Sequence, residues 1–171
     1  MIETFKQIRL VIMDMDGVLT SGKLLIHPDG NWIREMDIKD GYAIQFAVNS
    51  GIHLAVVTGS SSDPIKQRMR KLGVDFFFEN QKEKSVIVKE LMRKFVLSSE
   101  QTLFIGDDIP DLDAFEEVGL KACPVDAAQE VKNTADYISP YHGGNGCVRD
   151  ILEKILRVQG KWNEKSHISS I

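Results

Sequence analysis

Short apolar runs alternate along the chain with longer stretches in which apolar residues recur at helical spacing. Most of the short runs lack a polar residue at every second position, which is typical of parallel strands covered by helices on both faces. They predict six strands: LVIMDMD (10–16), HLAVVTG (53–59), VDFFFE (74–79), TLFIGDD (102–108), LKACPV (120–125) and ADYIS (135–139). We therefore expect an α/β fold built on a doubly wound parallel sheet.

The longer stretches predict the helices that lie between these strands. Glycine stands where a C-terminal cap belongs in several of them. The predicted helices are GYAIQFAVNSG (41–51), DPIKQRMRKLG (63–73), EKSVIVKELMRKF (83–95), DLDAFEEVG (111–119), AAQEVKNT (127–134) and GNGCVRDILEKILRVQG (144–160).

One segment interrupts the alternation directly after the first strand. KLLIH (23–27) and NWIREMD (31–37) flank a Pro-Asp-Gly turn, which predicts a β-hairpin over residues 23–37. The hairpin is too small to be a second domain, so we expect a single domain over residues 1–160. The last stretch, KWNEKSHISSI (161–171), has no stable period and predicts a flexible C-terminal tail.

Composition excludes several classes of protein. The formal net charge of −4 argues against a nucleic-acid backbone as the main partner, because that partner needs a basic face. No apolar run reaches the ~20 residues that span a bilayer, and the N-terminus MIETFKQIR lacks the features of a signal peptide. Two cysteines, Cys123 and Cys147, are too few for a disulfide framework. We expect both to be small buried hydrophobes and the protein to be cytoplasmic.

Reactive polar side chains follow the predicted strands, and ligands of open α/β sheets bind beyond the carboxyl ends of the strands. We therefore expect these side chains to meet at one site. Carboxylates gathered there would repel one another, and a hard cation with oxygen ligands, such as Mg²⁺, would relieve that repulsion. A lysine and backbone N–H groups would hold an anionic substrate, for which phosphate is the natural match. The residues concerned are Asp14, Asp16, Thr58, Gly59, Ser60, Lys84, Asp107, Asp108 and Asp111.

Two carboxylates at this spacing suit a two-step phosphoryl transfer. One carboxylate next to Mg²⁺ can attack phosphorus, and a second can protonate the leaving oxygen and later deprotonate water. DMDGV, VVTG, a lysine before a helix and GDDIPD, in that order, resemble the four motifs of the haloacid dehalogenase superfamily. The resemblance implies that Asp14 is the nucleophile and that Asp16 is the general acid/base, with its backbone carbonyl on the metal.

The resemblance also implies roles for the remaining motif residues. Thr58, Gly59 and Lys84 would hold the transferring phosphoryl group, and Asp107 would be the second carboxylate on Mg²⁺. Asp108 and Asp111 would support the metal site through water or Lys84. Lys82 is a nearby rival for Lys84, but its spacing from the strand is less suitable.

Further motifs resemble one family of the superfamily that lacks a cap domain, the 3-deoxy-D-manno-octulosonate 8-phosphate (KDO 8-phosphate) phosphatases. The similarity covers nearly the whole chain and includes DMDGVLTSG, DIKDGYAI, TGSSS, GDDIPD, GGNGCVRD and VQGKW. It implies a Mg²⁺-dependent phosphatase of lipopolysaccharide precursor synthesis. It also implies a homotetramer in which the hairpin and the tail contribute to neighbouring active sites.

One departure concerns the substrate. Many relatives have an arginine directly after the Thr-Gly pair, and this chain has Ser60. The groups that bind the carboxylate of the sugar acid therefore stay open, with Ser60, Arg68, Arg70 and Lys39 as candidates. A phosphatase of the nine-carbon 2-keto-3-deoxynononate 9-phosphate is an alternative. A different class, the phosphoaspartate receiver domain, uses similar residues but has its acidic pair early in the chain, before the phosphorylated strand, and lacks an acid two residues beyond the nucleophile.

Overall fold

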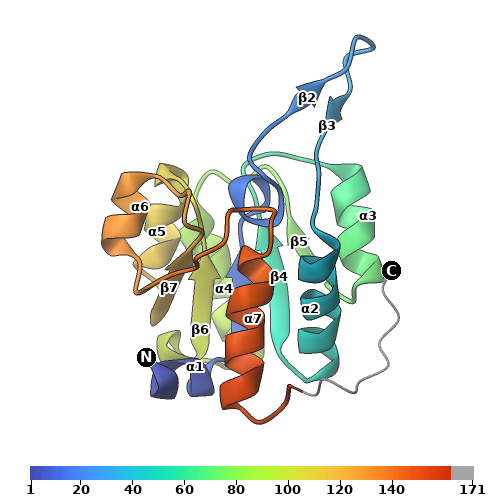
Figure 1. The fold of residues 1–171 in the computed structure, drawn as a ribbon. Helices are drawn as coiled ribbons and strands as arrows, with labels where there is room; N and C mark the ends of the chain where they lie inside the picture. Colours follow the sequence, from blue (N-terminus) through green and yellow to red (C-terminus); the bar gives the residue numbers. More distant parts are fainter. Residues whose placement is uncertain (163–171) are drawn as a thin grey trace.

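A parallel six-stranded sheet, in the order β5-β4-β1-β6-β7-β8, forms the centre of the molecule (Figure 1). The structure is a computed structural model that describes residues 1–162, so the tail predicted from Lys161 onward lies almost wholly outside the described residues. The doubly wound parallel sheet is confirmed. Its strands are β1 (Leu10–Met13), β4 (His53–Val57), β5 (Phe76–Phe78), β6 (Thr102–Ile105), β7 (Leu120–Cys123) and β8 (Tyr137–Ile138).

Helices cover both faces of the sheet, which explains why the strands show no polar alternation. In β1, Val11 and Met13 belong to the hydrophobic core on one face, and Leu10 and Ile12 belong to the core on the other. The first core is completed by α1 (Ile2–Gln7), α2 (Ile38–Asn49), α3 (Asp63–Lys71) and α7 (Cys147–Val158). The second core is completed by α4 (Lys84–Phe95), α5 (Leu112–Phe115) and α6 (Gln129–Thr134).

The register of the central strands places their carboxyl ends level with one another. Met13 of β1 pairs with Val56 of β4 on one side and with Ile105 of β6 on the other. The segments that follow these three residues therefore leave the sheet side by side. They carry the candidate site.

Several predicted elements have different bounds in the structure. Strand β1 ends at Met13 rather than at residue 16, because an irregular turn over Met15–Leu19 follows it. Helix α2 begins at Ile38, since the Asp37 side chain caps it by accepting from the backbone N–H groups of Lys39 and Asp40. Helix α5 is shorter than predicted, and α1 was not predicted.

The predicted hairpin is confirmed, as β2 (Leu25–Ile26) paired antiparallel with β3 (Trp32–Ile33). It projects from the carboxyl edge of the sheet (Figure 1), and a bridge between Thr20 and Met36 closes its base. Its strands are largely exposed even though they are apolar, with Ile26 68% and Trp32 60% exposed. The hairpin therefore contributes little to the core of its own subunit.

Cys123 and Cys147 are both buried and free, as the sequence predicts for small hydrophobes. Among residues 1–162, none of the helices has the length and apolar character needed to cross a membrane.

Candidate active site

A buried lysine joins two of the predicted aspartates at the carboxyl edge of the sheet. Lys84 Nζ, from the first turn of α4, lies 2.9 Å from Asp14 Oδ1 and 2.6 Å from Asp111 Oδ1. All three side chains are nearly inaccessible, at 4%, 11% and 1% exposure respectively. Burial by itself would lower the pKa of Lys84, but the charges of Asp111 and Asp14 outweigh it and raise that pKa. Lys84 is therefore held as a cation beside Asp14.

Asp111 uses its second oxygen to shape the loop that follows β6. Its Oδ2 accepts the backbone N–H of Asp107 at 2.9 Å and that of Asp108 at 3.2 Å. The Asp108 side chain caps the next turn by accepting from Ile109 N at 2.8 Å. Both oxygens of Asp111 are thus engaged inside the protein, so its geometry suits support of the site better than direct contact with an ion.

Three carboxylates of the site are close enough to share a cation. One oxygen from each of Asp14, Asp107 and Asp111 lies within 4.8 Å of the others. Burial, together with the charges of Asp111 and Asp14, raises the pKa of Asp107 to about 8. Burial and the charge of Asp111 raise the pKa of Asp14 to about 6, although Lys84 opposes the shift.

The oxygen Asp107 Oδ1 is buried and has no hydrogen-bond partner among the described residues. A buried, unpartnered carboxylate oxygen next to other carboxylates fits a hard divalent cation, which takes oxygen ligands. Asp14 and Asp107 are the side chains best placed to hold it.

Gly17 allows the two acidic loops to approach each other. Its φ of +92° lies in the region that favours glycine, and a Cβ at this position would overlap the Asp107 carboxylate. The close approach of Asp107 thus explains why a glycine follows Asp16. Any side chain at position 17 would displace Asp107.

The residues predicted to hold phosphate line the same cavity, which has a volume of about 560 Å³. Thr58 is buried at the end of β4, and its Oγ1 accepts the backbone N–H of Ser60 at 3.2 Å. Lys82 also lines the cavity but is exposed, and no ion pair is recorded for it among the described residues. The contacts of Lys84 with Asp14 and Asp111 support the choice of Lys84 over Lys82 at the reacting centre.

The Asp16 side chain points to the hairpin side of the site, where it meets a residue that the sequence analysis missed. Arg34, just after β3, places Nε 2.7 Å from Asp16 Oδ1 and Nη2 3.0 Å from Oδ2. Ser60 Oγ donates to Oδ2 at 2.8 Å. Burial would raise the pKa of Asp16, but Arg34 and Ser60 outweigh it and lower that pKa. No motif or periodicity in the sequence indicated that an arginine at the base of the hairpin would contact Asp16.

The glycine-rich motif GGNG buttresses the turn that carries the two aspartates. The backbone N–H of Gly144 donates to Val18 O at 2.8 Å, and a Cβ at Gly143 would overlap Gly17 O. Asp40 of α2 holds the motif in place, since its carboxylate accepts from the backbone N–H groups of Gly146 and Arg149. The motifs DIKDG and GGNGCVRD therefore support the turn that carries Asp14 and Asp16 from the side away from the cavity.

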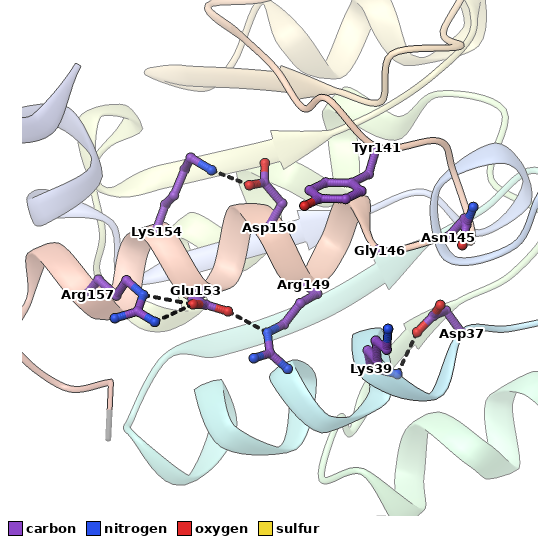
Figure 2. Close-up of a pocket in the computed structure, with 10 residues that line it drawn as sticks. All are labelled: Asp37, Lys39, Tyr141, Asn145, Gly146, Arg149, Asp150, Glu153, Lys154 and Arg157. Carbon is purple, nitrogen blue, oxygen red and sulfur yellow. Dashed lines mark hydrogen bonds and ion pairs between the residues drawn. The ribbon is translucent and has the colours of Figure 1, made fainter. Parts of the chain in front are cut away.

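The predicted carboxylate-binding candidates on α2 and α3 lie elsewhere in this chain. Lys39 lines a separate cavity of about 770 Å³ between α2 and α7 (Figure 2). The guanidinium of Arg68 lies against α2, where a Cβ at Gly41 would be 2.8 Å from Nη2. Neither residue lines the cavity of Asp14, and neither does Arg70. A role for them in substrate binding stays a prediction.

Comparison with known proteins agrees with this geometry. Residues 76–151 match the haloacid dehalogenase-like hydrolase family. Together with the parallel sheet and its acidic edge, this match indicates the class of haloacid dehalogenase-like hydrolases.

Individual relatives narrow the class. The chain is 37% identical to 3-deoxy-D-manno-octulosonate 8-phosphate phosphatase KdsC of Haemophilus influenzae, over 93% of this chain and 88% of the relative. It belongs to the 3-deoxy-D-manno-octulosonate 8-phosphate phosphatase family.

Solved structures of this family have the same fold. The phosphatase of Moraxella catarrhalis, in complex with magnesium, phosphate and KDO, has a TM-score of 0.89 at 33% identity, covering 93% of this chain and 91% of that one. The cobalt-bound phosphatase of Haemophilus influenzae has a TM-score of 0.87 at 37% identity, covering 92% of each chain. The predicted family and fold are therefore confirmed.

Proposed function

We propose that this protein hydrolyses KDO 8-phosphate to KDO and inorganic phosphate through a phosphorylated Asp14. The observation that carries the proposal is the buried group of Asp14, Lys84 and Asp111, with Asp107 beside it, in a chain of this family. An anionic nucleophile, a cation for the phosphoryl oxygens and a place for a divalent ion lie within one cavity.

The two steps follow from the positions of the side chains. An Asp14 oxygen attacks phosphorus while Lys84 and the Thr58 segment hold the phosphoryl oxygens. The bond to the sugar oxygen breaks, and Asp16 gives that oxygen a proton. Asp16 then takes a proton from water as the water attacks phosphorus, which releases phosphate and restores the Asp14 carboxylate.

The donor set suits Mg²⁺, the ion in the complex of the Moraxella catarrhalis phosphatase. Asp14, Asp107 and the backbone carbonyl of Asp16 would hold it. When bound, the ion would neutralise the gathered carboxylates and the charge of the phosphoryl group. Lys84 and Asp111 do not depend on the ion for their contact with each other.

The residues around Ser60, at the edge of the cavity, would determine which sugar acid the protein accepts. A substrate carboxylate needs a cation, and the exposed Lys82 lines the cavity next to the phosphate-binding segment. The nine-carbon 2-keto-3-deoxynononate 9-phosphate would bring the same two anionic groups, so it is the competing substrate.

A side-by-side assay of phosphate release decides between the two sugar acids. We expect kcat/KM for the eight-carbon phosphate to exceed that for the nine-carbon phosphate at least tenfold in the presence of Mg²⁺. The opposite ratio would assign the nine-carbon substrate. A lack of turnover on both sugar-acid phosphates and on p-nitrophenyl phosphate would overturn the phosphatase proposal. It would favour the alternative of a phosphoaspartate receiver domain.

We further propose that the protein is a homotetramer in which the hairpin contacts a neighbouring subunit. The exposed apolar side chains of the hairpin support this, because a lone subunit would leave Ile26 and Trp32 in water. Light scattering should give four times the subunit mass, and Trp32→Glu should reduce it, whereas the control Lys71→Glu, at an exposed position away from the hairpin, should not. A monomeric wild-type protein would overturn this proposal. The contribution predicted for the tail concerns residues outside the described part of the chain.

A further inference from the structure

The carboxylate of Asp16 accepts hydrogen bonds from residues of three separate segments. Arg34 makes two parallel bonds to it, from Nε to Oδ1 at 2.7 Å and from Nη2 to Oδ2 at 3.0 Å. Ser60 Oγ adds a bond to Oδ2 at 2.8 Å, and Thr20 Oγ1 adds one to Oδ1 at 3.2 Å. Each oxygen therefore accepts two hydrogen bonds. The carboxylate cannot turn without breaking several of them.

The burial of the two partners is unequal. The Arg34 side chain is only 7% exposed, whereas that of Asp16 is 30% exposed and lines the active-site cavity. The guanidinium thus lies behind the carboxylate and leaves it accessible from the cavity. In the part of the chain that the structure describes, Asp16 is the one acidic side chain recorded in an ion pair with Arg34.

Arg34 also ties the hairpin to the site. It follows β3 directly, and the bridge between Thr20 and Met36 closes the loop that runs from the acidic turn out to the hairpin and back. The hairpin strands are exposed, whereas the Arg34 side chain at the base of the hairpin is buried. A shift of the hairpin would move the guanidinium and, with it, the carboxylate.

We propose that Arg34 is a positioning residue for proton transfer, which fixes the Asp16 carboxylate in the orientation that reaches the leaving oxygen. The proposal rests on the proposed function, in which Asp16 is the acid/base. Its basis is the planar fork of the guanidinium, which fixes a carboxylate in direction as well as distance. Small errors in the placement of a reacting group are costly to rate.

The test uses two substrates that differ in their need for a proton. The sugar oxygen of KDO 8-phosphate must be protonated as it leaves, whereas p-nitrophenolate leaves without a proton. The parameter to compare is kcat/KM, because it reports the steps up to departure of the leaving group. We expect Arg34→Met to lower kcat/KM about 100-fold for KDO 8-phosphate, in the range of a lost acid/base contribution. For p-nitrophenyl phosphate we expect a loss of less than about fivefold.

Two further variants separate positioning from substrate binding and from folding. Arg34→Lys keeps the charge without the fork and should recover only part of the lost rate. In an Asp16→Asn background, Arg34→Met should lower kcat/KM for KDO 8-phosphate by less than about threefold, since residues that act as a unit are not additive. The double variant also removes both members of the ion pair, so it leaves no unpaired charge. Arg93→Met, an exposed arginine on α4, is the matched control and should behave as wild type.

Three results would overturn the proposal. They are an unchanged rate in Arg34→Met, an equal loss on both substrates, and a loss in the Asp16→Asn background as large as in the wild type. The last would show that Arg34 binds substrate directly. Full activity of Asp16→Asn itself, or no turnover by the wild type, would instead count against the proposed function.

Discussion

The site has two sides that carry similar charges in different ways. On the sheet side, Asp14 and Lys84 are buried at the ends of the central strands and are braced by Asp111. On the hairpin side, Asp16 is partly exposed and is braced by Arg34 from the base of a projecting hairpin. Only Met15 separates Asp14 from Asp16, yet Asp14 is held by Lys84 at the buried end of the sheet and Asp16 is held by Arg34 at the base of the hairpin.

The difference matches the two chemical roles proposed for Asp14 and Asp16. The sheet side gathers negative charge, and burial raises the pKa of Asp14 to about 6 and that of Asp107 to about 8. Asp14, the proposed nucleophile, would therefore need a nearby cation to be ionised at neutral pH. On the hairpin side, Arg34 and Ser60 outweigh burial and lower the pKa of Asp16. Asp16 is ionised there and ready to take a proton from water, and the negative phosphate of an incoming substrate would raise its pKa again for the first step.

The largest effect is expected on the sheet side. Asp14→Asn removes the attacking oxygen, and we expect a loss of more than about 10⁴-fold in kcat, as is typical for a removed nucleophile. The fold should remain, because the change removes one of three crowded carboxylates and leaves Lys84 paired with Asp111. Phosphate release with Mg²⁺ is the measurement, and Asp75→Asn, at an exposed position, is the control. Turnover above about 1% of wild type would remove Asp14 from the nucleophile's role.

A smaller loss is expected from the hairpin side. Asp16→Asn should lower kcat by about 10²–10⁴-fold, the usual contribution of general acid/base catalysis. The stabilisation of the protein by Mg²⁺ should persist, since the proposed ligand is the backbone carbonyl of this residue. Thermal unfolding with and without Mg²⁺ measures this. A loss of less than tenfold, or a lost response to Mg²⁺, would contradict the assignment.

The sheet side could be predicted from the sequence because local patterns and one topological rule suffice. Apolar runs located the strands, and parallel strands bring their carboxyl ends to one edge. This places Asp14, Thr58, Lys84 and Asp107 together without any knowledge of side-chain packing.

The hairpin side could not be predicted in the same way. The contact of Arg34 with Asp16 depends on how the hairpin leaves the sheet, and no periodicity encodes that direction. Arg68 and Lys39 show the converse, because their charge made them candidates while their helices place them outside the cavity of Asp14 in this chain, so their role in substrate binding stays a prediction. Chain direction after a loop is set by tertiary packing, so charge alone does not locate a residue.

Removal of the metal should make the stability of the sheet side depend on pH. Asp14 and Asp107 have folded pKa values raised above the ordinary value of 3.8, so the metal-free protein binds more protons when folded than when unfolded. Its stability should fall as pH rises from about 4 to about 8. A cation displaces these protons, so the increase in Tm caused by Mg²⁺ should be larger at pH 8 than at pH 6.

The Asp107→Asn variant tests the cause of this pH dependence. It removes the carboxylate with the most strongly raised pKa, so the metal-free variant should unfold at a higher temperature than the metal-free wild type at pH 8. Its response to Mg²⁺ should be nearly lost. Asp16→Asn, on the other side of the site, should keep the wild-type response. An Mg²⁺ response that is equal at both pH values would mean that the carboxylates of the sheet side are already ionised without the ion.

The smallest effect is expected from Ser60, at the junction of the two sides. Its hydroxyl donates one of the four hydrogen bonds to Asp16 and lies 3.2 Å from Thr58 Oγ1. Ser60→Ala removes about 1 kcal/mol of this contact, so kcat/KM for KDO 8-phosphate should fall about fivefold. Because Arg34 still makes two bonds to the carboxylate, the loss should be well below that of Arg34→Met. An effect of Ser60→Ala as large as that of Arg34→Met would show that the serine, rather than the hairpin, sets the orientation of Asp16.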